Sequence, residues 1–166
     1  MNPEKIAILI DSCTDVPPEL AASEEVYSIP VLIRYVDGEY RDGIDITAQK
    51  VYERFEEEVP KTSLPSLEGV QHIFAKIATD GYEKVIAITI SSGLSGTHGV
   101  VQLAAAQFDW IQTQVIDTKN IGIGAGFTAI HALQMVRQGM SFEEIVEKLK
   151  WDVVNTKVFF CVETLE

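Results

Sequence analysis

The most constraining feature of this sequence is a pair of short segments that are apolar almost throughout and end at a polar residue. Residues 6–10 read Ile-Ala-Ile-Leu-Ile and precede Asp11, and residues 84–90 carry a similar run that precedes Ser91. A strand with one solvated face alternates in polarity, whereas a strand of a parallel sheet is covered on both faces and is apolar at successive positions. The two segments therefore predict central strands of a parallel sheet.

Helical patterns separate these strands from further strand candidates. Asp37-Gly38 is typical of a hairpin turn. Further strands are expected at residues 29–35, 114–116 and 158–162. Helices are expected at residues 18–22, 48–58, 121–138 and 141–154. Two more are expected, one that begins at residue 66 and one that follows residues 91–97 and ends at about residue 107. This alternation predicts a three-layer α/β fold, with a mainly parallel sheet and helices on both faces. A chain of 166 residues can bury a full core, so we expect a single α/β domain over residues 1–166.

Charge and composition exclude several classes of function. The formal net charge of −12 repels the phosphate backbone of nucleic acids and the surface of anionic membranes. No apolar run is long enough for a signal peptide or a membrane span, so we expect a cytoplasmic protein without stable membrane insertion. Two cysteines make no disulfide framework, and the three histidines are far apart in the sequence. We therefore expect neither a metal nor a cofactor.

Four polar loops follow predicted strands or precede predicted helices. They are residues 11–15, 62–66, 91–97 and 117–120, and they are rich in hydroxyl groups. In open α/β sheets, ligands bind at the carboxyl edge of the strands. These loops are therefore the candidate ligand site.

Residues 91–97 form the most informative of these loops. Gly93 and Gly96 allow a tight turn and a close approach of backbone to ligand, while Ser92, Ser95 and Thr97 offer hydroxyl donors at the start of a helix, where an anion is favoured. The alternative is that Ser95 only caps the helix and the glycines only turn the chain.

The loop at residues 62–66 has a similar character. Thr62 and Ser63 offer hydroxyls, Pro65 keeps the preceding residue extended, and Ser66 is a helix N-cap. The alternative is that this loop only starts a helix. Lys61 beside it is expected to be a solvated surface lysine.

Enzymatic alternatives are weaker. Phosphoryl transfer through Asp11 requires a second acid two residues later, where Cys13 stands, so Asp11 is expected to bind neighbouring N–H groups. Cys13 is either a reactive thiol or, more commonly for a cysteine, a packed side chain. A serine hydrolase would use Ser95, but the final glycine of its motif comes one residue early and His98 is too near in sequence to be an obvious base. His72 and His131 fall in helical patterns.

The loops resemble, in their order and sequence, those of the DegV family. The resemblance runs over the whole chain and rests on residues 11–15 (Asp-Ser-Cys-Thr-Asp), 40–47 (Tyr-Arg-Asp-Gly-Ile-Asp-Ile-Thr), 62–66 (Thr-Ser-Leu-Pro-Ser), 90–97 (Ile-Ser-Ser-Gly-Leu-Ser-Gly-Thr), 115–118 (Val-Ile-Asp-Thr) and 163–166 (Glu-Thr-Leu-Glu). The two hydroxyl loops together are the specific part of this match.

The resemblance implies a bacterial, non-catalytic lipid carrier that takes part in phospholipid synthesis. Such proteins bind a long-chain fatty acid and present its carboxyl group to a separate fatty acid kinase, which forms an acyl phosphate. Carried over to this sequence, the carboxylate contacts are Thr62, Ser63 and Ser92, together with Ser95 and Thr97. The alternatives are the Ser95 hydrolase and a phosphotransfer subunit related to dihydroxyacetone kinases, which requires a histidine or metal-binding acids at the substrate.

Three departures from the family pattern stand out. His98 replaces a residue that is usually tyrosine-like, and residues 117–122 lack the second serine common in that loop, so no contact is carried over there. Family members also have a second lobe after the Thr-Leu-Glu segment. The resemblance therefore implies that residues 1–166 are the N-terminal lobe of a two-lobe protein.

Overall fold

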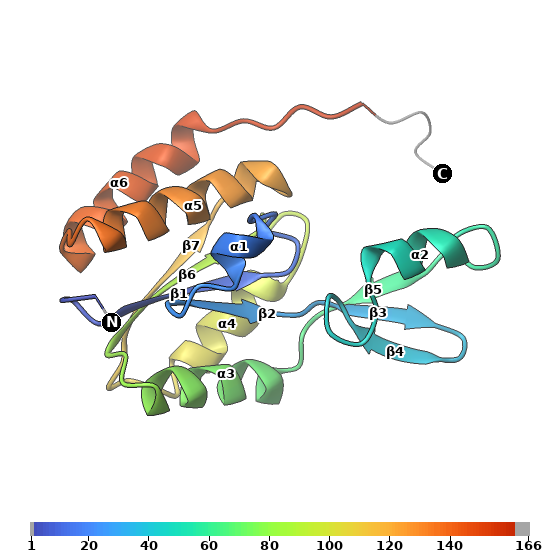
Figure 1. Ribbon diagram of the computed structural model, residues 1–166, viewed down its shortest axis with the longest axis horizontal. Coiled ribbons are helices and arrows are strands. Elements are labelled where there is room, and N and C mark those ends of the chain that lie inside the picture. The colour runs from blue at the N-terminus through green and yellow to red at the C-terminus, as the bar shows by residue number, and fades with distance from the viewer. Residues whose placement is uncertain (1, 162–166) are drawn as a thin grey trace.

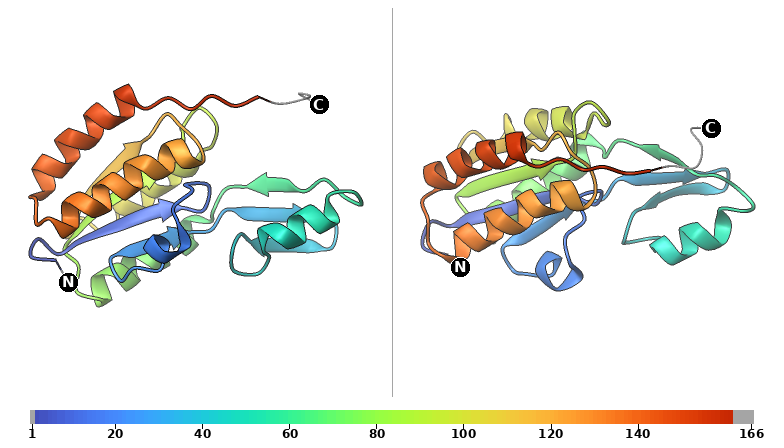
Figure 2. Two further views of the ribbon diagram at one scale, coloured as in Figure 1. Left: turned by 45° about the horizontal axis from the view of Figure 1, so that its top comes forward. Right: turned by 90° about the horizontal axis from the view of Figure 1, so that it is seen from above.

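The computed structural model describes residues 2–161. Its main sheet has four parallel strands in the order β2-β1-β6-β7 (Figure 1). These strands are β1 (Ile6–Asp11), β2 (Val26–Ile29), β6 (Lys84–Thr89) and β7 (Gln112–Asp117). Helices α5 (Ile123–Arg137) and α6 (Phe142–Asn155) cover one face, α3 (Leu67–Thr79) and α4 (Thr97–Ala105) cover the other, and a short α1 (Pro18–Ala21) follows β1 (Figures 1 and 2). The predicted three-layer α/β fold is confirmed.

Burial on both faces explains why the central strands are apolar throughout. Every residue of β1 is buried. Ile6 and Ile8 pack into the core under α5 and α6, whereas Ala7 and Leu9 pack into the core with α3 and α4. Successive side chains of a strand point to opposite faces, so a strand between two helix layers has no position left for a polar residue.

A second, smaller sheet projects from the main body. It is antiparallel, has the order β4-β3-β5, and consists of β3 (Leu32–Tyr35), β4 (Gly38–Arg41) and β5 (Lys61–Ser63). Helix α2 (Ala48–Arg54) lies against one of its faces, over a small cluster that contains Ile33, Tyr35 and Ile46 (Figure 1). We refer to residues 32–63 as the arm.

The arm corrects one expected strand. Residues 29–35 were expected to be one strand, but the chain changes sheet at Pro30, so that Ile29 ends β2 and Leu32 begins β3. Proline has no N–H group to donate to a sheet ladder, which makes it a natural break between two strands. Because the chain returns through residues 64–66, two short crossings connect the arm to the main body.

The expected last strand is wrong within the described residues. Residues 158–161 form no strand, and Phe159 and Phe160 are 92% and 73% exposed; Val162 lies outside the described residues. The amide of Asn120 holds this segment, because its Nδ2 donates to Thr156 O at 3.0 Å and its Oδ1 accepts from Val158 N at 3.2 Å. An apolar run predicts a buried segment, but here the segment joins no sheet and its two phenylalanine side chains are exposed.

Helix starts agree well with their sequence signals. Thr47 caps α2 and Ser66 caps α3, each through its side-chain oxygen, and Ser141 with Glu144 forms the expected capping box of α6. Helix α2 ends at Arg54, earlier than the expected residue 58. Within residues 2–161, no helix is both long and apolar enough to cross a membrane.

Candidate ligand-binding site

Asp11 connects the ends of the two central strands. Its side chain is fully buried; Oδ1 accepts hydrogen bonds from Cys13 N at 3.0 Å and Thr14 Oγ1 at 3.2 Å, and Oδ2 accepts from Ile90 N at 2.8 Å. Burial raises the pKa of Asp11, and these hydrogen bonds partly offset the effect. The expectation that Asp11 binds neighbouring N–H groups is confirmed. It has a structural role at the carboxyl edge of the sheet.

The loop at residues 91–97 is tied to the loop after β7. Ser91 N donates to Asn120 O at 2.7 Å, and Ser92 N donates to Asp117 Oδ1 at 3.1 Å. Helix α4 begins at Thr97 after a Gly96 N-cap that makes no side-chain hydrogen bond. The N-cap position is therefore Gly96, but Ser95 Oγ accepts from Thr97 N, the first N–H group of the helix, as the alternative interpretation expects in part.

The three predicted hydroxyls of this loop differ in access. Thr97 is fully buried, and its Oγ1 lies 2.9 Å from Ser95 Oγ, which also accepts from Thr97 N at 3.2 Å. Ser95 is half-buried, whereas Ser92 is exposed. Ser95 and Thr97 thus stabilise the loop through each other, and Ser92 is the hydroxyl that the loop presents to solvent.

The second hydroxyl loop touches the first. A methyl group on Gly96 would lie 3.1 Å from Leu64 Cδ1, so Leu64 packs directly against the start of α4. Residues 62–66 and 91–97 are about 30 positions apart in the sequence, yet the return crossing from the arm brings them together. This contact places the two predicted parts of the site side by side.

Thr62 and Ser63 lie on opposite faces of the arm sheet. Thr62 pairs with Ile33, whose side chain is buried in the cluster with α2, so Thr62 belongs to the α2 face. Ser63 pairs with Leu32 on the other face, and its Oγ donates to Glu39 Oε2 at 3.2 Å. Thr62 is exposed, and no hydrogen bond from its side chain is among those of the described residues. The two neighbours therefore do not point into one site.

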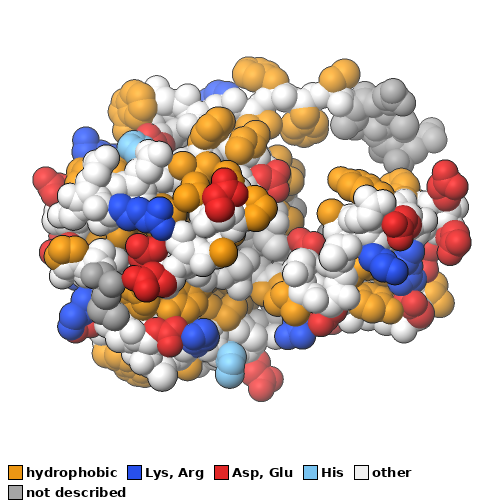
Figure 3. Space-filling view, in the orientation of Figure 1, with side chains coloured by type: hydrophobic (Ala, Val, Ile, Leu, Met, Phe, Trp, Pro, Cys, Tyr) orange, Lys and Arg blue, Asp and Glu red, His pale blue; other side chains and the backbone are white. Residues whose placement is uncertain are grey.

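An open gap lies between the main body and the α2 side of the arm, below the segment that follows α6 (Figure 3). Large apolar side chains are exposed in the α2 region, in the two hydroxyl loops, in α5 and in the segment after α6. They are Tyr52 and Phe55 on the α2 side, Leu64 and Leu94 in the hydroxyl loops, Ile123 and Phe127 in α5, and Phe159 and Phe160 after α6. Exposed apolar side chains that lie together are typical of a surface that a ligand or another protein covers.

A charged pair beside Ser92 is the part of the site that the sequence did not reveal. Lys119 Nζ lies 2.5 Å from Asp117 Oδ2 and donates to Ser92 Oγ at 3.2 Å. Burial of Asp117 opposes its ionisation, but hydrogen bonds from Lys119 and Ser92 outweigh burial and hold its pKa below the usual range. In the sequence, Lys119 is one polar residue of the loop at residues 117–120.

The geometry gives no support to hydrolysis at Ser95. His98 Nδ1 lies 3.2 Å from Thr89 Oγ1, and His131 Nδ1 lies 2.6 Å from Asp152 Oδ2 on the distant α5–α6 layer. Ser95 Oγ is paired with Thr97. Among residues 2–161, no group of three or more histidine, cysteine or acidic side chains is placed to hold a metal ion.

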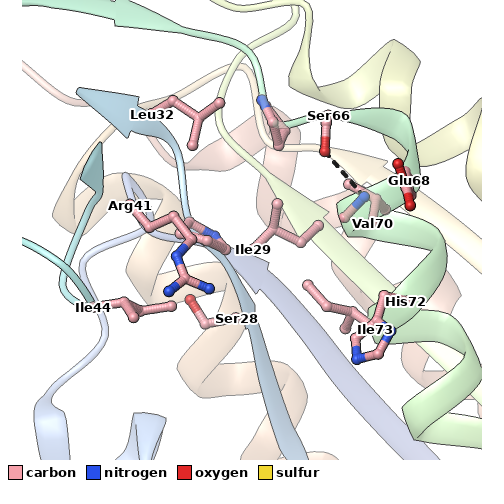
Figure 4. A pocket seen from close by; sticks show the side chains of 13 residues that line it. Ser28, Ile29, Leu32, Arg41, Ile44, Ser66, Glu68, Val70, His72 and Ile73 are labelled. Carbon is pink, nitrogen blue, oxygen red and sulfur yellow. Dashed lines mark hydrogen bonds between the residues drawn. The ribbon is translucent and has the colours of Figure 1, made fainter. Parts of the chain in front are cut away.

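A separate cavity of about 470 Å³ lies between α3 and the start of the arm (Figure 4). Ile29, Leu32, Ile73 and other apolar side chains line it together with Arg41 and His72, and Ser66 at its rim is occupied in capping α3. None of Thr62, Ser63, Ser92, Ser95 or Thr97 lines it. This cavity and the two hydroxyl loops are therefore separate features of the surface.

Cys13 is predicted to be an unreactive thiol. It is partly buried, and burial together with the charges of Asp11, Asp42 and Asp15 raises its pKa to about 11. At pH 8, only about one Cys13 in a thousand then carries the nucleophilic thiolate. In a Cys161→Ala variant, which leaves Cys13 as the single cysteine, we expect iodoacetamide labelling to be slow at pH 8 and to accelerate steeply toward pH 11. Rapid labelling at pH 7 would contradict this.

Comparison with known proteins gives a consistent match. The sequence profile of the DegV family, whose description is that of uncharacterised proteins, matches residues 5–166. A DegV domain-containing protein of Clostridium acetobutylicum is 36% identical over 163 residues, and one of Clostridium perfringens is 37% identical over 163 residues. Each match covers 98% of this chain and 58% of the relative, so the chain spans little more than half the length of these relatives.

Solved structures match over most of this chain. A DegV family protein of Thermus thermophilus described as binding a fatty acid has a TM-score of 0.81 at 28% identity, and covers 93% of this chain and 54% of its own. The fatty-acid-binding DegV of Bacillus subtilis has a TM-score of 0.82 at 28% identity, with 91% and 53% covered. A stearic-acid-binding protein of Eubacterium ventriosum has a TM-score of 0.79 at 28% identity, with 87% and 52% covered.

Proposed function

This chain belongs to the DegV family, and we propose that it binds a long-chain fatty acid whose carboxylate lies at Ser92 and Thr62. The single observation that carries the proposal is the contact between the two hydroxyl loops at the carboxyl edge of the sheet, where Leu64 packs against Gly96. Relatives of similar fold that are described as fatty-acid-binding support the choice of ligand.

The chemistry of the site suits an amphipathic anion. Hydroxyl and backbone N–H donors can bind a carboxylate at a solvent-facing loop. The exposed apolar side chains around the gap can contact an acyl chain, whose burial contributes about 0.8 kcal/mol per CH₂ group. Affinity therefore comes mainly from the chain and head-group selectivity from the loops.

The larger biological role is also a proposal. We infer a non-catalytic carrier in the bacterial cytoplasm that presents the carboxyl group to a fatty acid kinase for acyl phosphate formation. The absence of a Ser95–His98 pair among the described contacts supports a carrier over a hydrolase. Because the matched relatives are longer, we propose that this chain is an N-terminal lobe and that a second lobe covers the apolar gap. Acyl phosphate production by a fatty acid kinase and ATP, dependent on the loaded protein, would test the role.

Alanine replacements in the loops test the binding site. In the gene product that contains this sequence, we expect Ser92→Ala and Thr62→Ala each to weaken oleate binding by roughly tenfold, because each removes a hydrogen bond to a charged group. Isothermal titration calorimetry on delipidated protein measures the dissociation constants. Thr79→Ala, which removes an exposed hydroxyl at the far end of α3, is the matched control.

Two outcomes would count against the proposal. Wild-type protein that yields no fatty acid on solvent extraction and takes up neither oleate nor palmitate would overturn the ligand assignment. Wild-type binding that neither replacement weakens would leave the ligand in place but overturn the site. Ser63→Ala separates the faces of the arm: we expect it to resemble the control, because Ser63 faces Glu39 and lies on the face opposite Thr62.

A further inference from the structure

We propose that Lys119 is the cation of the head-group site, where it neutralises Asp117 and orients the hydroxyl of Ser92 toward the ligand carboxylate. This inference rests on the proposed function and adds to it a specificity-determining residue outside the two hydroxyl loops. It follows from a chain of hydrogen bonds that joins the loop after β7 to the loop after β6.

The chain of hydrogen bonds starts at Asp117, the last residue of β7. Oδ1 of Asp117 accepts from the backbone N–H groups of Ser92 and Lys119, both at 3.1 Å, and Oδ2 receives Lys119 Nζ at 2.5 Å. Lys119 adopts a left-handed backbone conformation with φ of 55°, which returns its side chain to the aspartate two residues before it. Nζ then reaches Ser92 Oγ at 3.2 Å. Asp117 thereby fixes both the serine and the lysine.

The direction of the serine proton follows from the donors present. An ammonium group has three donors and no acceptor, so Ser92 Oγ is the acceptor in its hydrogen bond with Lys119. The single hydroxyl proton of Ser92 is left to donate elsewhere. Without a ligand, a hydrogen bond from the Ser92 side chain contributes to the low pKa of Asp117. A ligand carboxylate replaces Asp117 as the acceptor of that proton.

The charge balance of the site requires a cation. The four polar loops, residues 11–15, 62–66, 91–97 and 117–120, contain three aspartates and a single basic residue, Lys119. Asp117 is mostly buried, with 14% of its side chain exposed, whereas the Lys119 side chain is 59% exposed. Without Lys119, a bound carboxylate at Ser92 would stand beside an unneutralised carboxylate in a poorly hydrated position. Lys119 is the group that makes an anion acceptable there.

The test compares a charged and an uncharged ligand with the same tail. Dissociation constants for oleate and oleyl alcohol are measured with the full gene product carrying Lys119→Met, Lys119→Gly or Lys119→Arg; glycine suits the positive φ, so at least one uncharged variant keeps the loop conformation. We expect both uncharged variants to bind oleate at least about tenfold more weakly, because an ion-paired hydrogen bond is lost. Oleyl alcohol affinity should change by less than about twofold, and arginine should retain most oleate affinity.

A double variant separates the effect of the Lys119 charge on oleate binding from the effect of its side-chain shape. Adding Asp117→Asn to Lys119→Met removes the unneutralised carboxylate, so we expect the double variant to bind oleate more tightly than Lys119→Met alone. Added salt should weaken oleate binding by the wild type more than by Lys119→Met.

The outcomes are distinguishable. A wild type that binds oleate, with Lys119→Met and Lys119→Gly binding it equally well, would overturn the role of Lys119 and leave the proposed function intact. Equal loss of oleate and oleyl alcohol would also overturn it, because that pattern marks a purely structural effect. A wild type that binds neither ligand would overturn the proposed function and this inference together.

Discussion

Replacing Gly126 with alanine is expected to lower the free energy of unfolding by about 3 kcal/mol, because the added methyl group collides with backbone. That methyl would lie 2.0 Å from the carbonyl oxygen of Asp15. Neither side can move freely, since Asp15 N donates to Gly122 O at 3.3 Å and Gly126 N donates to the same oxygen at 2.9 Å. Gly126 is therefore what lets the start of α5 lie against the loop after β1.

Urea denaturation followed by circular dichroism measures this effect, and Gly99→Ala is its control. Gly99 lies in α4, and apart from its chain neighbours and the backbone of its own helix no atom lies within 4 Å of an added methyl there. Alanine at this position should raise stability by about 0.5–1 kcal/mol through its helix propensity. We expect the Gly126 variant to melt roughly 6–12 °C lower than the wild type, given the usual 2–4 °C per kcal/mol at this chain length. A Gly126 variant as stable as the wild type would show that the contact is not tight.

Replacing Asp11 with alanine is expected to destabilise the protein by about 3 kcal/mol, because it leaves buried N–H groups without acceptors. The carboxylate accepts from Ile90 N at 2.8 Å and from Cys13 N at 3.0 Å, and its side chain is fully buried. The loops after β1 and β6 should loosen together. Faster amide hydrogen exchange at Cys13 and Ile90 would be the specific sign, beyond a lower midpoint in urea.

Asp11→Asn is the matched variant. Comparing its stability with that of the wild type at different pH tests the direction of the Asp11 pKa shift. Burial raises the folded pKa of Asp11 above its ordinary value of 3.8. The protonated carboxyl is therefore favoured by folding, and its contribution is fully present below pH 3.8 and is lost as pH rises through the folded pKa. The stability of the wild type relative to Asp11→Asn should thus fall as pH rises from about 3 to 7. A relative stability that rises over this range would contradict the direction of the shift.

Features that depend on neighbours in the sequence were predictable. Continuous apolar runs identified β1 and β6 because a strand covered on both faces has no solvated position, and Ser141 with Glu144 identified the start of α6 because a capping box closes within four residues. The hydroxyl loops were recognised from composition and from their resemblance to the DegV family, which the family match confirms.

The arrangement of the site depended on contacts between distant residues. Local pattern could not show that the chain changes sheet at Pro30, or that pairing with Ile33 and Leu32 turns Thr62 and Ser63 to opposite faces. Local pattern also could not show that the hydroxyls of Thr97 and Ser92 differ in accessibility, because packing buries Thr97 completely.

The sequence by itself thus determined the α/β class, the helix starts, the family and the two loops that carry hydroxyl groups. The tertiary structure alone decided which of those hydroxyls face solvent. It alone also brought Lys119 Nζ to 3.2 Å from Ser92 Oγ. The physical reason is that helix caps and strand burial depend on residues within a few positions, whereas the distance between two loops depends on how every strand and helix between them packs.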